Sequence, residues 1–232
     1  FDKNQVYRGK KPIHWCPHCE TSLAGAEVEQ TEKTDPGVYV KFKLKNDDAS
    51  LLVFTTTPWT LPSNVAIAAT RQGVYVKVKT DSGNLILAEA RLELLDSLGI
   101  NYRIIRKFKG KTLEGEEYSP LFDLPTQTSL NKNKKARRIY MSIPILKERI
   151  APKTAEKKGV KAKDVFEQFV SVDEGTGFVH MAPGHGKTDN EVGKHYGLPE
   201  LSPLDDACNF TENAGKYRGM FLKDADNFII KD

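Results

Sequence analysis

The sequence predicts a strand-rich α+β domain with a closed or barrel-like sheet and a few short helices packed outside it. Three observations support this fold class. Apolar runs of strand length recur along the chain, clusters of turn residues separate them, and only two or three segments show helical periodicity. Many short strands combined with few helices are typical of such a layered sheet.

The expected strands are read from apolar periodicity. Apolar residues alternate from Val38 to Leu44, as in a strand with one buried face, and the run 51–54 is continuously apolar. The turn residues 81–84 are flanked by apolar runs and predict a hairpin between them. The remaining predicted strands are 74–78, 85–87, 102–108, 139–145, 169–172 and 177–181.

Two helices are expected. In Glu89–Leu98 the leucines fall on one face, and Gly99 is placed to end the helix. The second helix follows a glycine-rich turn, with Thr188 as its N-cap and Glu191 completing a capping box. Asp189 would then be the first helical residue.

The composition is that of an ordinary globular protein. With 232 residues, 28% charged and 39% hydrophobic, the chain is neither disordered nor fibrous. It has no apolar run of the roughly 18 residues that a membrane helix needs, and its polar start is unlike a signal peptide. We therefore expect a cytoplasmic protein without a membrane partner. Because it begins with Phe1 instead of methionine, we expect a piece of a longer chain.

Two of the three cysteines, Cys16 and Cys19, have the spacing of half a zinc knuckle. A structural zinc takes four ligands, and Cys208 is isolated far along the chain. His14 and His18 are further candidate ligands. We favour a knuckle whose second half lies outside this sequence over a closed site within it.

Positive charge is concentrated between Lys132 and Lys163, where twelve lysines or arginines face two glutamates. Such a cluster attracts a phosphate backbone, although a charge run is also common in a solvated loop. The candidate nucleic-acid contacts are Lys134, Lys135, Arg137 and Arg138.

The stretch Thr55-Thr-Thr-Pro-Trp-Thr-Leu-Pro-Ser-Asn64 follows an apolar strand and cannot continue it, because its prolines lack a backbone donor. It offers hydroxyls, backbone groups and one aromatic ring in a small space, as ligand pockets do. The alternative is structural, since threonines favour strands and Trp59 can fill a core.

A second informative stretch, 173–189, runs from a strand through a glycine-rich turn into a helix. Asp189 in the first helical turn can hold an ammonium group near the end of the strand, although aspartate is also common there for structural reasons. A lone His180 on a strand is likewise often only a buried, hydrogen-bonded residue. The glycine spacing of a phosphate-binding loop is missing, as are the Gly-x-Ser-x-Gly and His-Glu-x-x-His motifs.

Together, Thr55–Asn64 and Gly175-Thr-Gly-Phe-Val-His-Met-Ala-Pro-Gly-His-Gly186 resemble the two signature motifs of the isoleucyl-tRNA synthetase editing (connective peptide) domain. The leucyl and valyl enzymes carry Thr-Thr-Arg-Pro in the first motif, so Thr57-Pro-Trp59 points to the isoleucine branch. The resemblance extends to 15–28 and 113–122. The aminoacylation signatures His-Ile-Gly-His and Lys-Met-Ser-Lys-Ser are absent.

The resemblance implies an organisation and a fold. Residues 1–30 would be a linker region with the half zinc knuckle, 31–225 the editing domain, and 226–232 a return linker. The fold would be the barrel-like one of the valyl, leucyl and isoleucyl editing domains. A structural zinc would be completed by residues outside the chain, and editing itself would require no cofactor.

The resemblance also implies roles for individual residues. Asp189 matches the acid that anchors the α-ammonium group of the substrate, and His180 matches the residue that limits the space for the side chain. The residues that match the pocket floor, which holds the terminal adenosine and orients the attacking water, are Thr55, Thr56, Thr57, Trp59 and Asn64. Thr188 departs from the family, which often has an acidic residue there.

The implied activity is hydrolysis of valyl-tRNA(Ile), with hydrolysis of valyl-adenylate left open as a second reaction. The implied partners are the acceptor end of tRNA(Ile) with its valyl ester and the remainder of the parent synthetase. Two alternatives remain: a non-catalytic tRNA-binding appendix, which would not need Asp189, and a zinc-dependent binding module, which would need bound metal.

Overall fold

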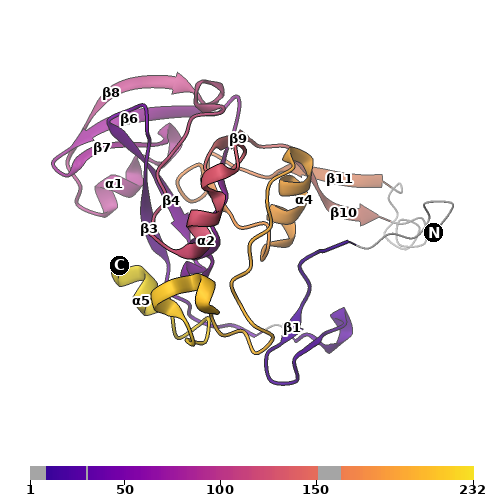
Figure 1. Cartoon of the computed structure of the whole chain (residues 1–232). Helices are drawn as coiled ribbons and strands as arrows, with labels where there is room; N and C mark the ends of the chain where they lie inside the picture. Colours follow the sequence, from indigo (N-terminus) through magenta and orange to yellow (C-terminus); the bar gives the residue numbers. More distant parts are fainter. Residues whose placement is uncertain (1–8, 30, 151–162) are drawn as a thin grey trace.

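The computed structural model describes residues 9–29, 31–150 and 163–232. Its body consists of two sheets, one of five strands and one of three (Figure 1). The larger sheet has the order β3 (Val38–Lys43), β4 (Ala49–Thr55), β7 (Gly83–Ala88), β6 (Val74–Thr80) and β8 (Tyr102–Lys109). The smaller sheet has the order β12 (Phe178–Met181), β5 (Ala66–Ala69) and β9 (Ile139–Met141).

The two sheets share one core. Strand β12 contacts β4 as well as pairing with β5, so the smaller sheet closes against the larger one. Their facing side chains are fully buried, which removes the apolar positions of both sheets from water. Among these side chains are Phe42, Leu51, Ile67, Tyr75 and Ile139, and Tyr118, which lies outside both sheets, is buried in the same core. The strand-rich α+β prediction is confirmed.

Short helices cover this body. In α1 (Glu93–Ser97), Leu94 and Leu95 pack on Val76 and Leu87 of the larger sheet. The other α-helices are α2 (Pro125–Thr128), α4 (Lys187–Tyr196) and α5 (Asp226–Lys231). The 3₁₀ segments are η1 (Gly25–Glu27), η2 (Pro58–Ser63), η3 (Glu89–Arg91), η4 (Gly110–Leu113), η5 (Ser129–Lys132) and η6 (Glu212–Tyr217).

Two small hairpins lie outside the body. Strands β1 (Trp15–Cys16) and β2 (Thr21–Ser22) surround the cysteine pair, and β10 (Pro144–Ile150) pairs with β11 (Lys163–Gln168) in an arm that projects from the two larger sheets (Figure 1). Residues 151–162, which hold part of the basic segment, lie outside the described residues. Within the described chain, no helix is long and apolar enough to cross a bilayer.

The predicted strand at 169–172 is wrong. Val170 is buried, but its backbone pairs with side chains: its N–H donates to Ser142 Oγ and its carbonyl accepts from Thr70 Oγ1. Side-chain partners thus replace the neighbouring strand that apolar residues alone predict, and the strand β11 ends just before this point.

The predicted helix 89–98 is shorter than expected, because it splits into η3 and α1. Its predicted end is confirmed by Gly99, whose φ of +66° lies in the left-handed region that favours glycine. At the other end of the chain, residues assigned to a return linker form α5, in which Ile229 is 3% exposed and packs in the main core. The domain boundaries stay predictions.

Candidate functional site

The two sequence motifs meet in a cavity of about 430 Å³. One wall comes from the end of β4 and the turn η2, and the other from β12 and the start of α4. Because β12 packs beside β4, residues more than a hundred positions apart face the same space. The lining residues are Phe54, Thr55, Thr56, Thr57, Trp59, Thr60, Val179, His180, His185, Gly186 and Asp189.

The threonines at the end of β4 hold each other in place. Thr57 donates its backbone N–H to Thr55 Oγ1 at 3.1 Å, and the two hydroxyls lie 3.3 Å apart. Pro58 then starts η2, where the missing N–H of proline is not needed. Thr56 is exposed at the mouth of the cavity, so its hydroxyl is accessible to a ligand or to water.

His180 is held by hydrogen bonds on both ring nitrogens. Its Nδ1 lies 2.9 Å from Asn64 Nδ2, and its Nε2 lies 2.8 Å from Thr60 Oγ1. The Thr60 hydroxyl already donates to the Thr57 carbonyl at 2.8 Å, so it accepts from His180. An amide nitrogen can only donate. The network therefore assigns the proton of a neutral imidazole to Nε2.

This arrangement excludes His180 as a general base, because the lone pair on Nδ1 is already used. Burial, together with the nearby His185, lowers the pKa of His180 to about 4, so the ring is neutral at pH 7. His180 is thus a rigid, uncharged part of the cavity wall, in agreement with a role in limiting size.

Asp189 lies in the first turn of α4, in the same wall of the cavity as His180. Its Oδ2 accepts the backbone N–H of Ala182 at 2.9 Å, which fixes the carboxylate at the end of β12. Burial raises its pKa, while the hydrogen bond from Ala182 acts against that rise. No cation of the described chain forms an ion pair with it. A half-buried carboxylate without a cationic partner favours an ammonium ligand.

The predicted N-cap at Thr188 is wrong. Helix α4 begins at Lys187 with Gly186 as N-cap, which places Asp189 third in the helix. A side chain at Gly186 would collide with Asp189, since a Cβ there would lie 2.7 Å from Asp189 Cγ. The glycine therefore provides the space that the carboxylate occupies.

Trp59 forms one side of the cavity, as predicted, but its neighbour His185 was not singled out from the sequence. The two rings pack edge to face with centroids 5.0 Å apart, and His185 Nε2 lies 3.0 Å from Ser63 Oγ. Burial lowers the pKa of His185 to about 4. The Trp59 backbone N–H donates to Asp226 of α5 at 2.8 Å, which fixes η2 against the C-terminal helix.

Asn64 does not line the cavity. It is 3% exposed and lies behind His180, where Nδ2 also donates to the Ala66 carbonyl at 3.0 Å. The predicted direct contact with substrate is therefore wrong, because the Asn64 side chain forms its hydrogen bonds with His180 and with the backbone.

The predicted nucleic-acid contacts separate into two groups. Arg137 is 8% exposed and donates to the Gln127 carbonyl at 2.9 Å, and Arg138 is bound to Glu117 and to the Gly115 carbonyl. The buried Arg137 is therefore not accessible to phosphate, which corrects the prediction for that residue, whereas Arg138 is partly exposed and its contact with nucleic acid stays a prediction. Lys134 and Lys135 are exposed, although Lys135 Nζ donates to the Tyr196 carbonyl at 2.9 Å.

The cysteine pair lies in one tight turn, where the Cys19 N–H is 3.4 Å from Cys16 Sγ. That geometry fits half a knuckle. Within the described residues, no group of three or more His, Cys, Asp or Glu side chains is arranged to hold a metal ion. A zinc completed by ligands outside the chain stays a prediction.

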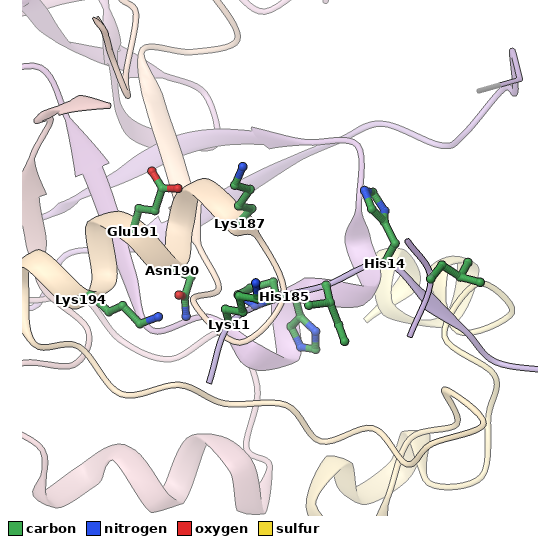
Figure 2. Close-up of a pocket in the computed structure, with 10 residues that line it drawn as sticks. Lys11, His14, His185, Lys187, Asn190, Glu191 and Lys194 are labelled. Carbon is green, nitrogen blue, oxygen red and sulfur yellow. The ribbon is translucent and has the colours of Figure 1, made fainter. Parts of the chain in front are cut away.

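A larger cavity of about 630 Å³ adjoins the first one and shares His185 with it. Figure 2 shows Lys187, Asn190, Glu191 and Lys194 of α4 on one side and residues of the N-terminal segment, including Lys11 and His14, on the other. Three lysines and one glutamate line this larger cavity, so its charged side chains carry a net positive charge.

Comparisons with known proteins agree with this geometry. The family model of class I tRNA synthetases (I, L, M and V) matches residues 1–191. The chain is 38% identical to the isoleucine–tRNA ligase of Fervidobacterium pennivorans, covering 100% of this chain and 22% of that protein. It is 40% identical to the isoleucine–tRNA ligase of Methanothermobacter marburgensis, covering 100% and 19%. The chain thus spans about a fifth of the length of these relatives.

The fold is similar to that of the solved GlLeuRS-CP1 structure, with a TM-score of 0.55 at 13% identity over 84% of this chain and 94% of that one. At this identity the likeness concerns the fold alone. The chain therefore belongs to the class I tRNA synthetase family (I, L, M and V) and has the CP1 editing-domain fold.

Proposed function

We propose that this domain hydrolyses the ester of valine wrongly attached to tRNA(Ile). The observation that carries the proposal is that Asp189 and His180 line the same small cavity. The carboxylate offers a site for the α-ammonium group of an aminoacyl ester, and the neutral imidazole ring limits the size of the side chain that fits beside it.

A separate hydrolytic cavity answers a limit of selection by binding. One methylene is worth only about 1–3 kcal/mol in an apolar pocket, and the choice between isoleucine and valine by this synthetase is the standard example of that limit. A second pocket that admits valine and excludes isoleucine by size adds a second selection, and the overall discrimination is the product of the two selection factors. A wall fixed on both ring nitrogens suits that task, because it cannot yield to a larger side chain without breaking hydrogen bonds.

Chemistry in this cavity would depend on positioning. His180 has no free lone pair, and Asp189 is directed to the amine, so neither is available as a strong base. The hydroxyls of Thr55, Thr56 and Thr57 can instead orient a water against the ester carbonyl, and a hydroxyl of the terminal ribose can assist proton transfer. Hydrolysis of valyl-adenylate would use the same amine and side-chain contacts, so we propose it as a second reaction of the same cavity.

The three lysines that line the cavity of Figure 2 support a nucleic-acid substrate over a free amino acid. Lys11 and Lys187 adjoin the space next to His185, where the phosphates of a bound RNA end would need cations. The exposed Lys134 offers one more cation. The alternative of a non-catalytic tRNA-binding appendix uses these lysines but gives Asp189 only its structural hydrogen bond to Ala182.

The test is deacylation of valyl-tRNA(Ile) and isoleucyl-tRNA(Ile) by this chain under the same conditions. We expect the valyl ester to be hydrolysed at least tenfold faster, which follows from a size difference worth about 1.4 kcal/mol or more. Equal hydrolysis of both esters would contradict size selection. Tight tRNA binding without hydrolysis of either ester would favour the appendix.

A further inference from the structure

Tyr118 is connected to the cavity only through other residues. It is fully buried, contributes nothing to the cavity wall, and donates its hydroxyl to Asn64 Oδ1 at 2.6 Å. Its backbone is fixed as well, by a bridge to Leu44 and by an N–H bond to the Arg137 carbonyl at 3.1 Å. The fixed backbone therefore holds the Tyr118 hydroxyl in place against Asn64.

The amide of Asn64 is fixed from two sides. Oδ1 accepts from Tyr118, and Nδ2 donates both to the Ala66 carbonyl and to His180 Nδ1. A reversed amide would place Oδ1 against the Ala66 carbonyl and Nδ2 against the tyrosine hydroxyl. Asn64 can therefore present only its donor to His180.

The direction of every hydrogen bond in the series from Tyr118 to Thr57 follows from this constraint. Tyr118 donates to Asn64, Asn64 donates to His180 Nδ1, and His180 Nε2–H donates to Thr60. Thr60 in turn donates to the carbonyl of Thr57, one of the cavity threonines. Each donor fixes the next, so the tautomer and the position of the His180 ring are set from the core.

We propose that Tyr118 and Asn64 are positioning residues that act on substrate selection through His180, by holding its ring in the Nε2–H form against the cavity. This inference rests on the proposed function for its effect on substrates, but the ring state itself does not depend on that function. A fixed wall discriminates between two side chains that differ by one methylene, whereas a wall that can move discriminates less well.

The phenolic hydroxyl suits this role because it remains a donor. Burial raises the pKa of Tyr118 well above its usual value, and only the hydrogen bond to Asn64 and the nearby Arg137 act against that rise. The Tyr118 side chain therefore does not ionise under physiological conditions. The donors and acceptors of the hydrogen-bond series from Tyr118 to Thr57 thus do not change through ionisation of this tyrosine.

Nitrogen-15 NMR of the His180 ring measures the tautomer directly. The protein is expected to show a protonated Nε2 and an unprotonated Nδ1. In Asn64→Asp the residue next to Nδ1 has no donor, so His180 should take a proton on Nδ1. In Tyr118→Phe the amide keeps only the Ala66 anchor, and the ring nitrogens should move toward the tautomer mixture of free imidazole. The matched control is Tyr217→Phe, which removes another buried hydroxyl, one that donates to Asp232 at 2.9 Å, and should leave the His180 spectrum unchanged.

Selectivity provides the second readout. The loss of one hydrogen bond behind the wall should lower the ratio of valyl to isoleucyl ester hydrolysis by about two- to tenfold in Tyr118→Phe, mainly through faster isoleucyl hydrolysis. Tyr217→Phe should keep the ratio of the parent.

The two readouts separate the outcomes. If folded Tyr118→Phe and Asn64→Asp both keep the parent His180 spectrum, the chain of hydrogen bonds does not set the ring and the inference is overturned. A changed spectrum with an unchanged ratio would overturn the role in selection. If the parent hydrolyses neither ester, the proposed function fails, whereas the NMR result still decides whether Tyr118 and Asn64 set the ring.

Discussion

At the scale of single residues, the site holds two neutral histidines in place of charged ones. Burial lowers the pKa of both His180 and His185 to about 4, against about 6.5 in an unfolded chain. The unfolded state therefore binds more protons between these values. The stability that this difference supports is fully present above pH 6.5 and is lost as the pH falls toward 4.

We expect the free energy of unfolding to fall by up to about 2 kcal/mol for each histidine between pH 7 and pH 5. Asp189 works in the opposite direction, because its raised pKa lets the folded state take up a proton more readily. Urea unfolding at the two pH values measures the net loss. His185→Phe, which keeps a ring against Trp59, should reduce the loss. An equal loss between pH 7 and pH 5 in the parent and in His185→Phe would contradict the contribution of His185.

A second residue-scale prediction concerns Gly186. A Cβ at this position would lie 2.7 Å from Cγ and 2.8 Å from Oδ2 of Asp189, so alanine should displace the carboxylate and break its bond to Ala182. We expect Gly186→Ala to lose at least about tenfold in the hydrolysis of valyl-tRNA(Ile), the equivalent of about 1.4 kcal/mol. The control is Gly25→Ala, where a Cβ meets nothing within 4 Å. Full activity of Gly186→Ala would show that the position of this carboxylate does not matter.

The residues that sequence reasoning placed in the cavity are those of the two motifs: Asp189, His180, Trp59 and the three threonines. It missed His185 and Thr60, although both lie within the quoted stretches, because their roles depend on partners far away in the sequence. Tyr118 could not be found from local pattern at all, since its hydroxyl meets Asn64 across 54 positions. Asn64 was assigned to the substrate because a motif gives proximity but not the direction of a side chain.

At the scale of elements, the cavity depends on the contact between η2 and α5. Asp226, 3% exposed, accepts the Trp59 N–H, and Ile229 anchors the helix in the core. We expect Ile229→Ala to lower the free energy of unfolding by about 2–5 kcal/mol, as for other buried isoleucines. Ile230, 38% exposed on the same helix, is the matched control and should cost much less. Urea titration of Ile229→Ala and Ile230→Ala measures both free energies of unfolding. Equal losses of that free energy in the two variants would mean that α5 is not docked through Ile229.

The elements that could be predicted are those whose apolar pattern matches their burial. In β3 the alternation is visible because Phe42 faces the core while its neighbours on both sides are exposed. The buried stretch 169–172 misled the prediction because apolar residues do not show whether a backbone pairs with a strand or with side chains. The start of α4 was misplaced by two residues, since Thr188 has a capping side chain by type but does not form the bond.

At the scale of the whole molecule, the two sheets bring together motifs that are far apart in sequence, and nothing local in either motif specifies that β12 packs beside β4. From the sequence, that link is implied only by the resemblance to the family. The chain corresponds to about a fifth of its relatives, so zinc binding and docking to the remaining synthetase are questions about a longer protein.

Binding of tRNA also belongs to this scale. We expect Lys134→Ala to weaken binding of tRNA(Ile) and to reduce the slope of log affinity against log salt by about 0.7–0.9, the value for one phosphate contact. Thr112→Ala, which removes an exposed hydroxyl on η4 without a charge, serves as the control. Fluorescence titration at several salt concentrations measures the slopes. An unchanged slope in Lys134→Ala would remove this lysine from the interface.

The most direct test of the central claim compares the parent chain with Asp189→Asn in deacylation of valyl-tRNA(Ile). Asparagine keeps an oxygen for the Ala182 N–H and removes only the charge, so the fold should be retained. If Asp189 anchors the α-ammonium group, hydrolysis should fall by at least about a hundredfold, the equivalent of about 2.7 kcal/mol for a lost charge-assisted contact. Hydrolysis at the parent rate by a folded Asp189→Asn would contradict the account, because the cavity would then act without the carboxylate charge that is proposed to anchor the α-ammonium group.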